Sequence, residues 1–173
     1  MSLVMGVSGV YVSPDTNTAA WTGNPPTLNE SKTWHNLGKT QGGVRFRLGV
    51  DTTAVECDQS QYPVLEIPTR GTLEVEVPLL EQNAANLKLA FTGVYDSSAS
   101  LPLVVEQINR IPDPVDLKVE SAVLDGKKKI FVFTKVRPRV NVDTSFGRDA
   151  ATVMTIVFQG TSETKIGVFE VTV

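Results

Sequence analysis

The side chains that most often carry out catalysis are few in this sequence. His35 is the only histidine and Cys57 the only cysteine, which excludes a multi-histidine metal site, an internal disulfide and a cysteine-rich zinc site within one chain. His35 follows Trp34 in the segment TWHNLG, and we interpret it as a packing or surface residue. Cys57 has no second cysteine at CxxC spacing and no histidine near it in sequence, which favours a structural thiol over a nucleophile.

One pair of carboxylates has a spacing that could do chemistry. In an extended strand, Glu74 and Glu76 lie on the same face about 7 Å apart, where two carboxylates could hold a cation or support glycoside hydrolysis. Glutamates that alternate on the exposed face of a strand are common, and we favour that interpretation. The sequence has no compact calcium loop, phosphate-binding loop or dinucleotide-binding fingerprint. We therefore expect a protein that is not an enzyme and that uses no cofactor or metal.

Length and charge narrow the class further. The chain of 173 residues is long enough for one domain with its own core, and we expect a single domain over residues 1–173. A formal net charge of −3 gives no overall basic field that would attract nucleic acid. We interpret the locally basic segments 127–129 and 137–139 as solvated strand ends. No apolar run approaches the roughly 20 residues that a membrane helix needs, so no membrane partner is expected.

Strand-like patterns dominate the chain. We predict strands at residues 3–12, 44–50, 54–57, 70–77, 115–124, 129–140, 152–158 and 166–173. Asp125 and Gly126 separate two of these strands with a strong hairpin signal, since a two-residue type I′ turn needs positive φ at both positions. A second hairpin is expected to join Phe158 to Ile166. The predicted fold class is mostly β, a β-sandwich or β-barrel.

One helix and two long loops complete the prediction. The spacing of apolar residues predicts a helix over about 80–92, with Gly93 ending it and with Leu80, Leu87 and Phe91 as its anchors. Residues 13–33 have no usable period and are expected to form a long loop that docks through Trp21. Residues 141–150 form the other predicted loop.

The strands that precede the helix have two different faces. In the strand 70–77, apolar residues alternate with polar ones, and the strand 44–50 alternates in the same way. We expect Val44, Phe46 and Leu48 to face a core. The side chains expected to point outward are Thr72, Glu74, Glu76, Arg45 and Arg47. The strands 129–140 and 152–158 are apolar on both faces at least in part, so either a large core or partner subunits must cover them.

Long strands also leave unpaired backbone groups at the margins of a sheet, and few edge-blocking residues are present. Joining the sheets of neighbouring subunits would satisfy those edges, and head-to-tail contacts that close by rotation would make a ring. Stacked rings would make a tube, and an acidic lining would keep a DNA polyanion from adhering as it passes.

The segment 34–91 resembles phage tail tube proteins through the order of its motifs. LGKTQGGV at residues 37–44 precedes a strand, and DQS follows at residues 58–60. RGTLEVEV at residues 70–77 forms the next strand, and LLEQNAANL at residues 79–87 belongs to the helix motif. The resemblance implies a β-sandwich or β-barrel tail-tube fold with one packed helix, in which sheets join between subunits into a ring. The tube protein of type VI secretion shares this fold, so a secretion-system tube is a close alternative.

The resemblance also implies a function, partners and contact residues. It implies a structural virion protein of the tail, assembled in the host cytoplasm into hexameric rings that stack into a conduit for viral DNA. Its partners would be further copies of itself, the tail initiator and terminator, possible sheath subunits, and DNA bound without sequence specificity. The face of Thr72, Glu74, Glu76, Arg45 and Arg47 would line the lumen or meet a neighbour. Trp21, Phe146 and Arg148 would make ring-to-ring or surface contacts.

A second hypothesis is a β-sandwich module that binds sugar or protein, such as a virion decoration domain. Trp21 and Trp34 could then stack on a ligand. Such a module would be monomeric or trimeric and would have a defined pocket, whereas a tube protein would stack.

Overall fold

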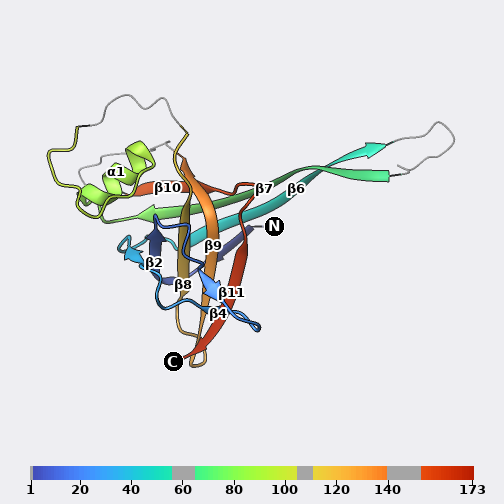
Figure 1. The fold of residues 1–173 in the computed structure, drawn as a ribbon, viewed down its shortest axis with the longest axis horizontal. Helices are drawn as coiled ribbons and strands as arrows, with labels where there is room; N and C mark the ends of the chain where they lie inside the picture. The colour runs from blue at the N-terminus through green and yellow to red at the C-terminus, as the bar shows by residue number, and fades with distance from the viewer. Residues whose placement is uncertain (1, 56–64, 105–110, 140–152) are drawn as a thin grey trace.

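The computed structural model describes residues 2–55, 65–104, 111–139 and 153–173 (Figure 1), and within them the chain is mostly antiparallel β. Its strands are β1 (Ser2–Met5), β2 (Val7–Ser13), β3 (Trp21–Thr22), β4 (Thr27–Leu28), β5 (His35–Asn36), β6 (Val44–Val55), β7 (Leu65–Leu79), β8 (Val115–Ser121), β9 (Lys127–Arg139), β10 (Met154–Gln159) and β11 (Ile166–Thr172). The helix α1 spans Ala84–Thr92.

Nine of these strands form one sheet that bends along β9. Its order is β1-β6-β7-β10-β9-β8-β2-β5, with β11 joined to β9 as a branch. The first part of β9 pairs with β8 and β11, whereas its last residues pair with β10. The two parts of the sheet pack against each other, and in the described residues β1 and β5 end the sheet without meeting. The mostly β prediction is therefore confirmed, but the sheet is open and does not form a closed barrel.

The core lies between the two parts of the sheet. The alternation predicted for 70–77 is confirmed, because Leu73, Val75 and Val77 are buried while the residues between them are half-buried. Strand β10 adds its own alternate side chains to the same face. The buried cluster is Val10, Val12, Leu37, Val44, Leu73, Val75, Val77, Leu79, Leu89, Ala90, Val115, Leu117, Val119, Phe133, Val136, Met154, Ile156 and Phe158.

Strand β9 is covered on both faces, as its sequence predicts. Phe133 faces the main core, whereas Ile130 and Val132 belong to a second cluster with Ala20. Trp21, Leu28, Trp34 and Phe169 pack around that second cluster. The cover is therefore the chain's own segment 13–33, which contains the small β3–β4 hairpin, and no partner subunit is needed there.

The helix begins four residues later than the sequence predicts. Strand β7 continues through Pro78 to Leu79, with Pro78 opposite Thr155 of β10. Helix α1 then starts after Asn83, whose side chain accepts a hydrogen bond from the Asn86 backbone N–H at 2.8 Å. It ends at Gly93, as predicted, where a φ of 68° favours glycine.

The predicted helix anchors need correction for the same reason. Leu80 lies before the helix and is only half-buried, Leu87 packs at the margin of the core, and Phe91 is 39% exposed. The side chains that fix α1 are Leu89 and Ala90, which are fully buried. Together with Asn86 they form the buried side of α1.

One of the two predicted hairpins is confirmed. Asp125 and Gly126 have φ values of 52° and 71°, and the flanking Leu124 and Lys127 exchange two backbone hydrogen bonds of 2.9 Å. The prediction of a second hairpin, from Phe158 to Ile166, was wrong, because β11 does not pair with β10. It returns to β9 instead, with Ile166 opposite Phe133.

Strands β6 and β7 extend far beyond the body of the molecule (Figure 1). The predicted strands 44–50 and 54–57 are parts of the single strand β6 as far as residue 55. Strand β1 pairs with β6 only at 44–47, and β10 pairs with β7 only at 74–79. Residues 48–55 and 65–73 thus form a two-stranded ribbon, called the arm below. Leu48, expected in the core, is 51% exposed because no second layer of the described residues packs over it.

Candidate functional site

A charged surface covers the outer side of β6, β7 and the end of β9. Because neighbouring residues of a strand point to opposite faces, the residues between the core positions all project from this side. Register pairs Arg45 with Glu76 and Arg47 with Glu74 across β6 and β7. This surface, called the charged face below, consists of Arg45, Arg47, Asp51, Arg70, Thr72, Glu74, Glu76, Arg137 and Arg139.

Ion pairs connect three strands of the charged face. Glu76 lies between two arginines, with its carboxylate oxygens 3.6 Å from Nη1 of Arg45 and 3.5 Å from Nη2 of Arg47. Glu74 is paired across β10, where its Oε1 lies 3.3 Å from Nη1 of Arg139. The glutamate side chains are about one-quarter exposed and these arginine side chains about one-half exposed. At this exposure each pair stabilises the fold by only about 0–1 kcal/mol.

The charged face carries both signs of charge. Its described residues include five arginines and three carboxylates. Glu74 and Glu76 occupy the middle strand, and arginines flank them on β6 and β9. The strand β7 alone predicts acidity, and the arginines of β9 that balance it come from a distant part of the sequence.

The structure therefore brings together the five residues that the sequence assigns to a lumen or inter-subunit face. Thr72 lies on the same side of β7 as the glutamates, and its hydroxyl donates to the carbonyl of Gly49 at 3.4 Å. Trp21 lies elsewhere, on the second cluster, with its ring centroid 5.9 Å from that of Phe169. Phe146, Arg148, the whole predicted 141–150 loop and Cys57 lie outside the described residues.

A buried ion pair that sequence reasoning missed fixes the segment 13–33 to the sheet. The side chains of Lys32 and Asp116 are 0% and 2% exposed, and Nζ lies 2.8 Å from Oδ2. Lys32 also donates to the carbonyls of Asp15 and Thr18, the latter at 2.7 Å. Asp116 accepts the backbone N–H of Lys135 at 2.8 Å. Every polar partner that a buried ammonium needs is thus supplied.

This pair stands at the point where β9 passes from one part of the sheet to the other. Lys135 has a φ of 52°, which is uncommon for a residue with a side chain, and the β8–β9 register shifts between Val115 and Leu117. A bulge of this kind bends a strand. Asp116 holds the bulge through the Lys135 N–H, so the ion pair joins the loop and the bend in one contact.

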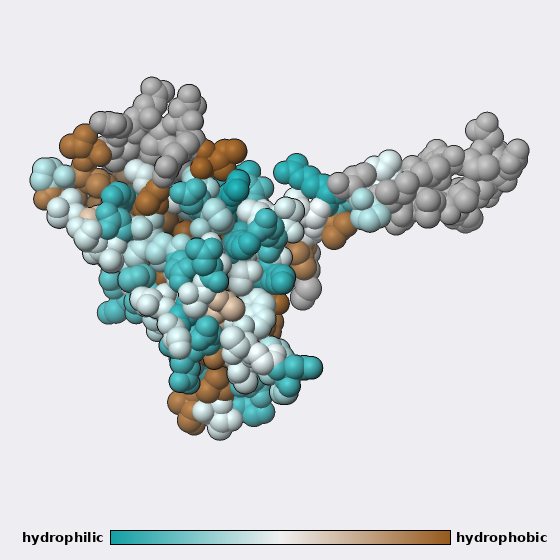
Figure 2. All heavy atoms as spheres, in the orientation of Figure 1, coloured by the Kyte–Doolittle hydropathy of each residue, from teal (hydrophilic) through white to brown (hydrophobic). Residues whose placement is uncertain are grey.

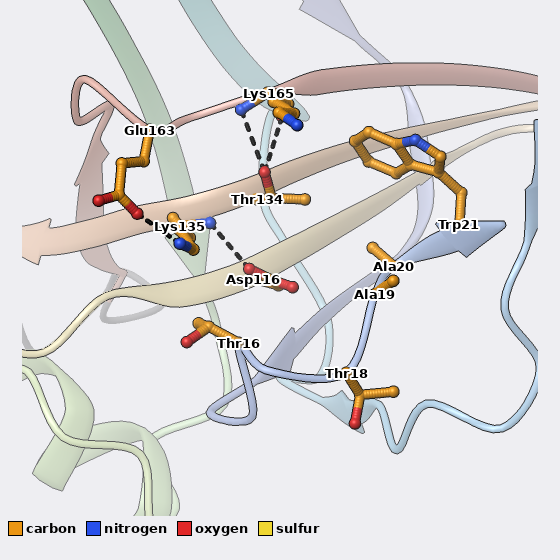
Figure 3. Close-up of a pocket in the computed structure, with 10 residues that line it drawn as sticks. All are labelled: Thr16, Thr18, Ala19, Ala20, Trp21, Asp116, Thr134, Lys135, Glu163 and Lys165. Atoms are coloured by element: carbon orange, nitrogen blue, oxygen red, sulfur yellow. Dashed lines mark hydrogen bonds and ion pairs between the residues drawn. The ribbon is translucent and has the colours of Figure 1, made fainter.

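A cavity of about 490 Å³ lies beside this contact, between Trp21 and the loop before β11 (Figure 3). Its polar groups bind mainly to each other. Lys135 pairs with Glu163, and the Thr134 hydroxyl accepts the Lys165 N–H at 3.1 Å. Salt-bridging to Lys135 lowers the pKa of Glu163, which keeps that carboxyl ionised. The cavity therefore lies where the segment 13–33 meets the sheet.

The described residues contain no group of three or more histidine, cysteine, aspartate or glutamate side chains placed to bind a metal ion. No helix in the described part of the chain has the length and apolar character to cross a membrane. No protein-family model matches this sequence, and no curated protein is significantly similar to it.

Proposed function

We propose that this protein is a structural subunit that assembles with copies of itself into stacked rings, forming the tube of a phage tail through which viral DNA passes. The observation that carries the proposal is the arm. A two-stranded ribbon is marginal in water by itself, because it has no further strand or layer to bury its side chains. A neighbouring subunit would supply that support.

The composition of the arm is consistent with such a contact. Leu48 and Val50 are 51% and 61% exposed on the side that faces the core further along β6. They line a groove of about 500 Å³ where the arm meets Gly160 and Ile166. Figure 2 shows apolar residues where the arm leaves a largely polar body. Long exposed strand edges invite pairing with another chain, so an arm of this kind favours assembly.

The margin of the sheet offers a second surface for assembly. Strand β11 pairs with β9 on one side only among the described strands. Ile166, Val168 and Val171 on it are 41–58% exposed. An edge strand with apolar side chains is a template for a strand from another subunit. Sheets joined in this way in a head-to-tail arrangement close into a ring when the rotation allows it.

The binding-module alternative is less well supported, since the two tryptophans are engaged within the chain. Trp21 packs on Phe169. The ammonium groups of Lys32 and Lys118 lie over the ring of Trp34, 5.6 Å and 5.4 Å from its centroid. A secretion-system tube would use the same assembly and would differ only in what it conducts.

Sedimentation velocity over a range of protein concentrations tests self-assembly. We expect the wild type to form species much larger than the monomer as concentration rises. Val168→Lys should stay folded but assemble poorly, because it places a cation on the exposed apolar edge of β11. Glu30→Lys, which adds a lysine at an exposed position outside the proposed contacts, should assemble like the wild type. Equal assembly of both variants would remove the edge of β11 from the contact.

A further inference from the structure

The arrangement of charge on the charged face suggests a specific kind of contact. Arg45 and Arg47 on β6, and Arg137 and Arg139 on β9, are two positions apart on their strands. Their Cα atoms are therefore separated by about 7 Å, roughly twice the 3.4 Å that separates successive phosphates of one strand along the helix axis. Strands β7 and β10 lie between the two rows, so the rows are about 14 Å apart.

The arginines are accessible although they are paired. Side chains of Arg45, Arg47 and Arg139 are 48%, 51% and 52% exposed, while the carboxylates between them are 26–28% exposed. The closest contacts within these pairs are 3.3–3.6 Å, longer than a strong charge-assisted hydrogen bond of about 2.7–2.9 Å. A phosphate oxygen can therefore approach a guanidinium group from the solvent side without the pair being dismantled first.

We propose that the charged face contacts the phosphate backbone of nucleic acid through these two arginine rows, and that Glu74 and Glu76 weaken the contact. This inference rests on the proposed function for its biological setting, because DNA would meet the face inside an assembly. Backbone contact reads no sequence. The glutamates partly neutralise the positive charge that the phosphates meet, which makes the contact brief and allows the polymer to move along the surface.

Fluorescence anisotropy of a labelled DNA duplex, measured from low to moderate NaCl at protein concentrations below assembly, tests the inference. Each phosphate contact contributes about 0.9 to the slope of log affinity against log salt concentration. Removing two contacts in Arg137→Gln/Arg139→Gln should make the slope shallower by about 1.8. Glu74→Gln/Glu76→Gln should bind more tightly by about two- to fivefold.

A matched control removes the same charge from another place. Lys127→Gln/Lys129→Gln deletes two positive charges at the β8–β9 hairpin, away from the charged face. It should leave the slope within error of the wild type. Thermal unfolding of each variant verifies that the fold is retained.

Three results would overturn the inference. They are the absence of salt-dependent binding by the wild type, equal slopes for the arginine and lysine variants, and equal displacement of the duplex by an acidic polypeptide of matched charge. The last result would assign the face to an acidic protein. Self-assembly is measured separately, so tubes that form without DNA binding would contradict this inference alone, and DNA binding without assembly would contradict only the proposed function.

Discussion

The ammonium nitrogen of Lys32 lies 2.8 Å from Oδ2 of Asp116, and both side chains are closed off from solvent. The contact joins the segment 13–33 to the strand that bends between the two parts of the sheet, because Asp116 also binds the backbone of Lys135 at the bulge. One ion pair thus holds the cover of the second apolar cluster and the bend that creates the main core.

Replacing Lys32 with methionine should destabilise the protein strongly. The substitution leaves the Asp116 carboxylate buried without its counter-charge, and breaking a buried pair in this way costs about 3–5 kcal/mol. Urea unfolding monitored by tryptophan fluorescence gives the free energy. The double variant Lys32→Met/Asp116→Asn should be more stable than Lys32→Met alone, since it removes the uncompensated charge. If the two variants were equally unstable, the charge on Asp116 would not be the cause.

Shortening the arm should abolish assembly without unfolding the body. Val50 pairs directly with Gly71, so residues 51–70 can be replaced by Asn-Gly, which forms a two-residue hairpin turn. We expect near-UV circular dichroism like that of the wild type and a monomer at all concentrations in sedimentation. A shortened chain that still assembles would show that the arm is not the contact. As a control, a chain with only 56–64 replaced separates the arm strands from their connection.

Acid should weaken the contact between Glu120 and its two lysines. Burial alone would raise the pKa of Glu120, but hydrogen bonds and charges from Lys128 and Lys118 outweigh it and hold the pKa below the ordinary 4.5. Because the folded pKa is the lower one, the stabilisation is complete above pH 4.5 and is lost as pH falls through the folded value. The stability difference between the wild type and Glu120→Gln should therefore shrink below pH 4.5 in urea titrations. Curves that stay parallel from neutral to acid pH would refute the assignment.

The β8–β9 turn should require glycine at position 126. A φ of 71° at Gly126 is unfavourable for a residue with a Cβ atom, so Gly126→Ala should cost about 1–2 kcal/mol. Gly71 is a suitable control, because an added Cβ there meets nothing within 4 Å and its φ is not in the left-handed region. Differential scanning calorimetry should show a lower melting temperature for the first variant than for the second. Equal melting temperatures would mean that the turn relaxes at little cost.

Properties that depend on a few neighbouring residues could be predicted from the sequence. The alternation in β7, the Asp125–Gly126 turn and the end of α1 at Gly93 are set by local geometry, and the structure confirms them. The predicted start of α1 was wrong, because pairing with β10 extends β7 through Pro78. That pairing depends on a strand far away in the sequence.

Long-range relationships explain the other differences. Alternation correctly indicates which face of β6 Leu48 occupies, but it does not reveal that Leu48 stays half exposed, with no layer over it in the part of the chain that the structure describes. Lys32 and Asp116 are far apart in the sequence, with β5, β6, β7 and α1 between them, and neither stands in a pattern that indicates a buried pair. The balance of the charged face could not be predicted either, since Arg139 reaches Glu74 across β10.

Negative-stain electron microscopy of the purified protein at high concentration tests self-assembly into a tube most directly. We predict ring-shaped particles and hollow tubes built of stacked rings, which disappear when the arm is shortened. A field of separate particles no larger than one subunit, at every concentration at which the wild type stays folded, would contradict the proposed function.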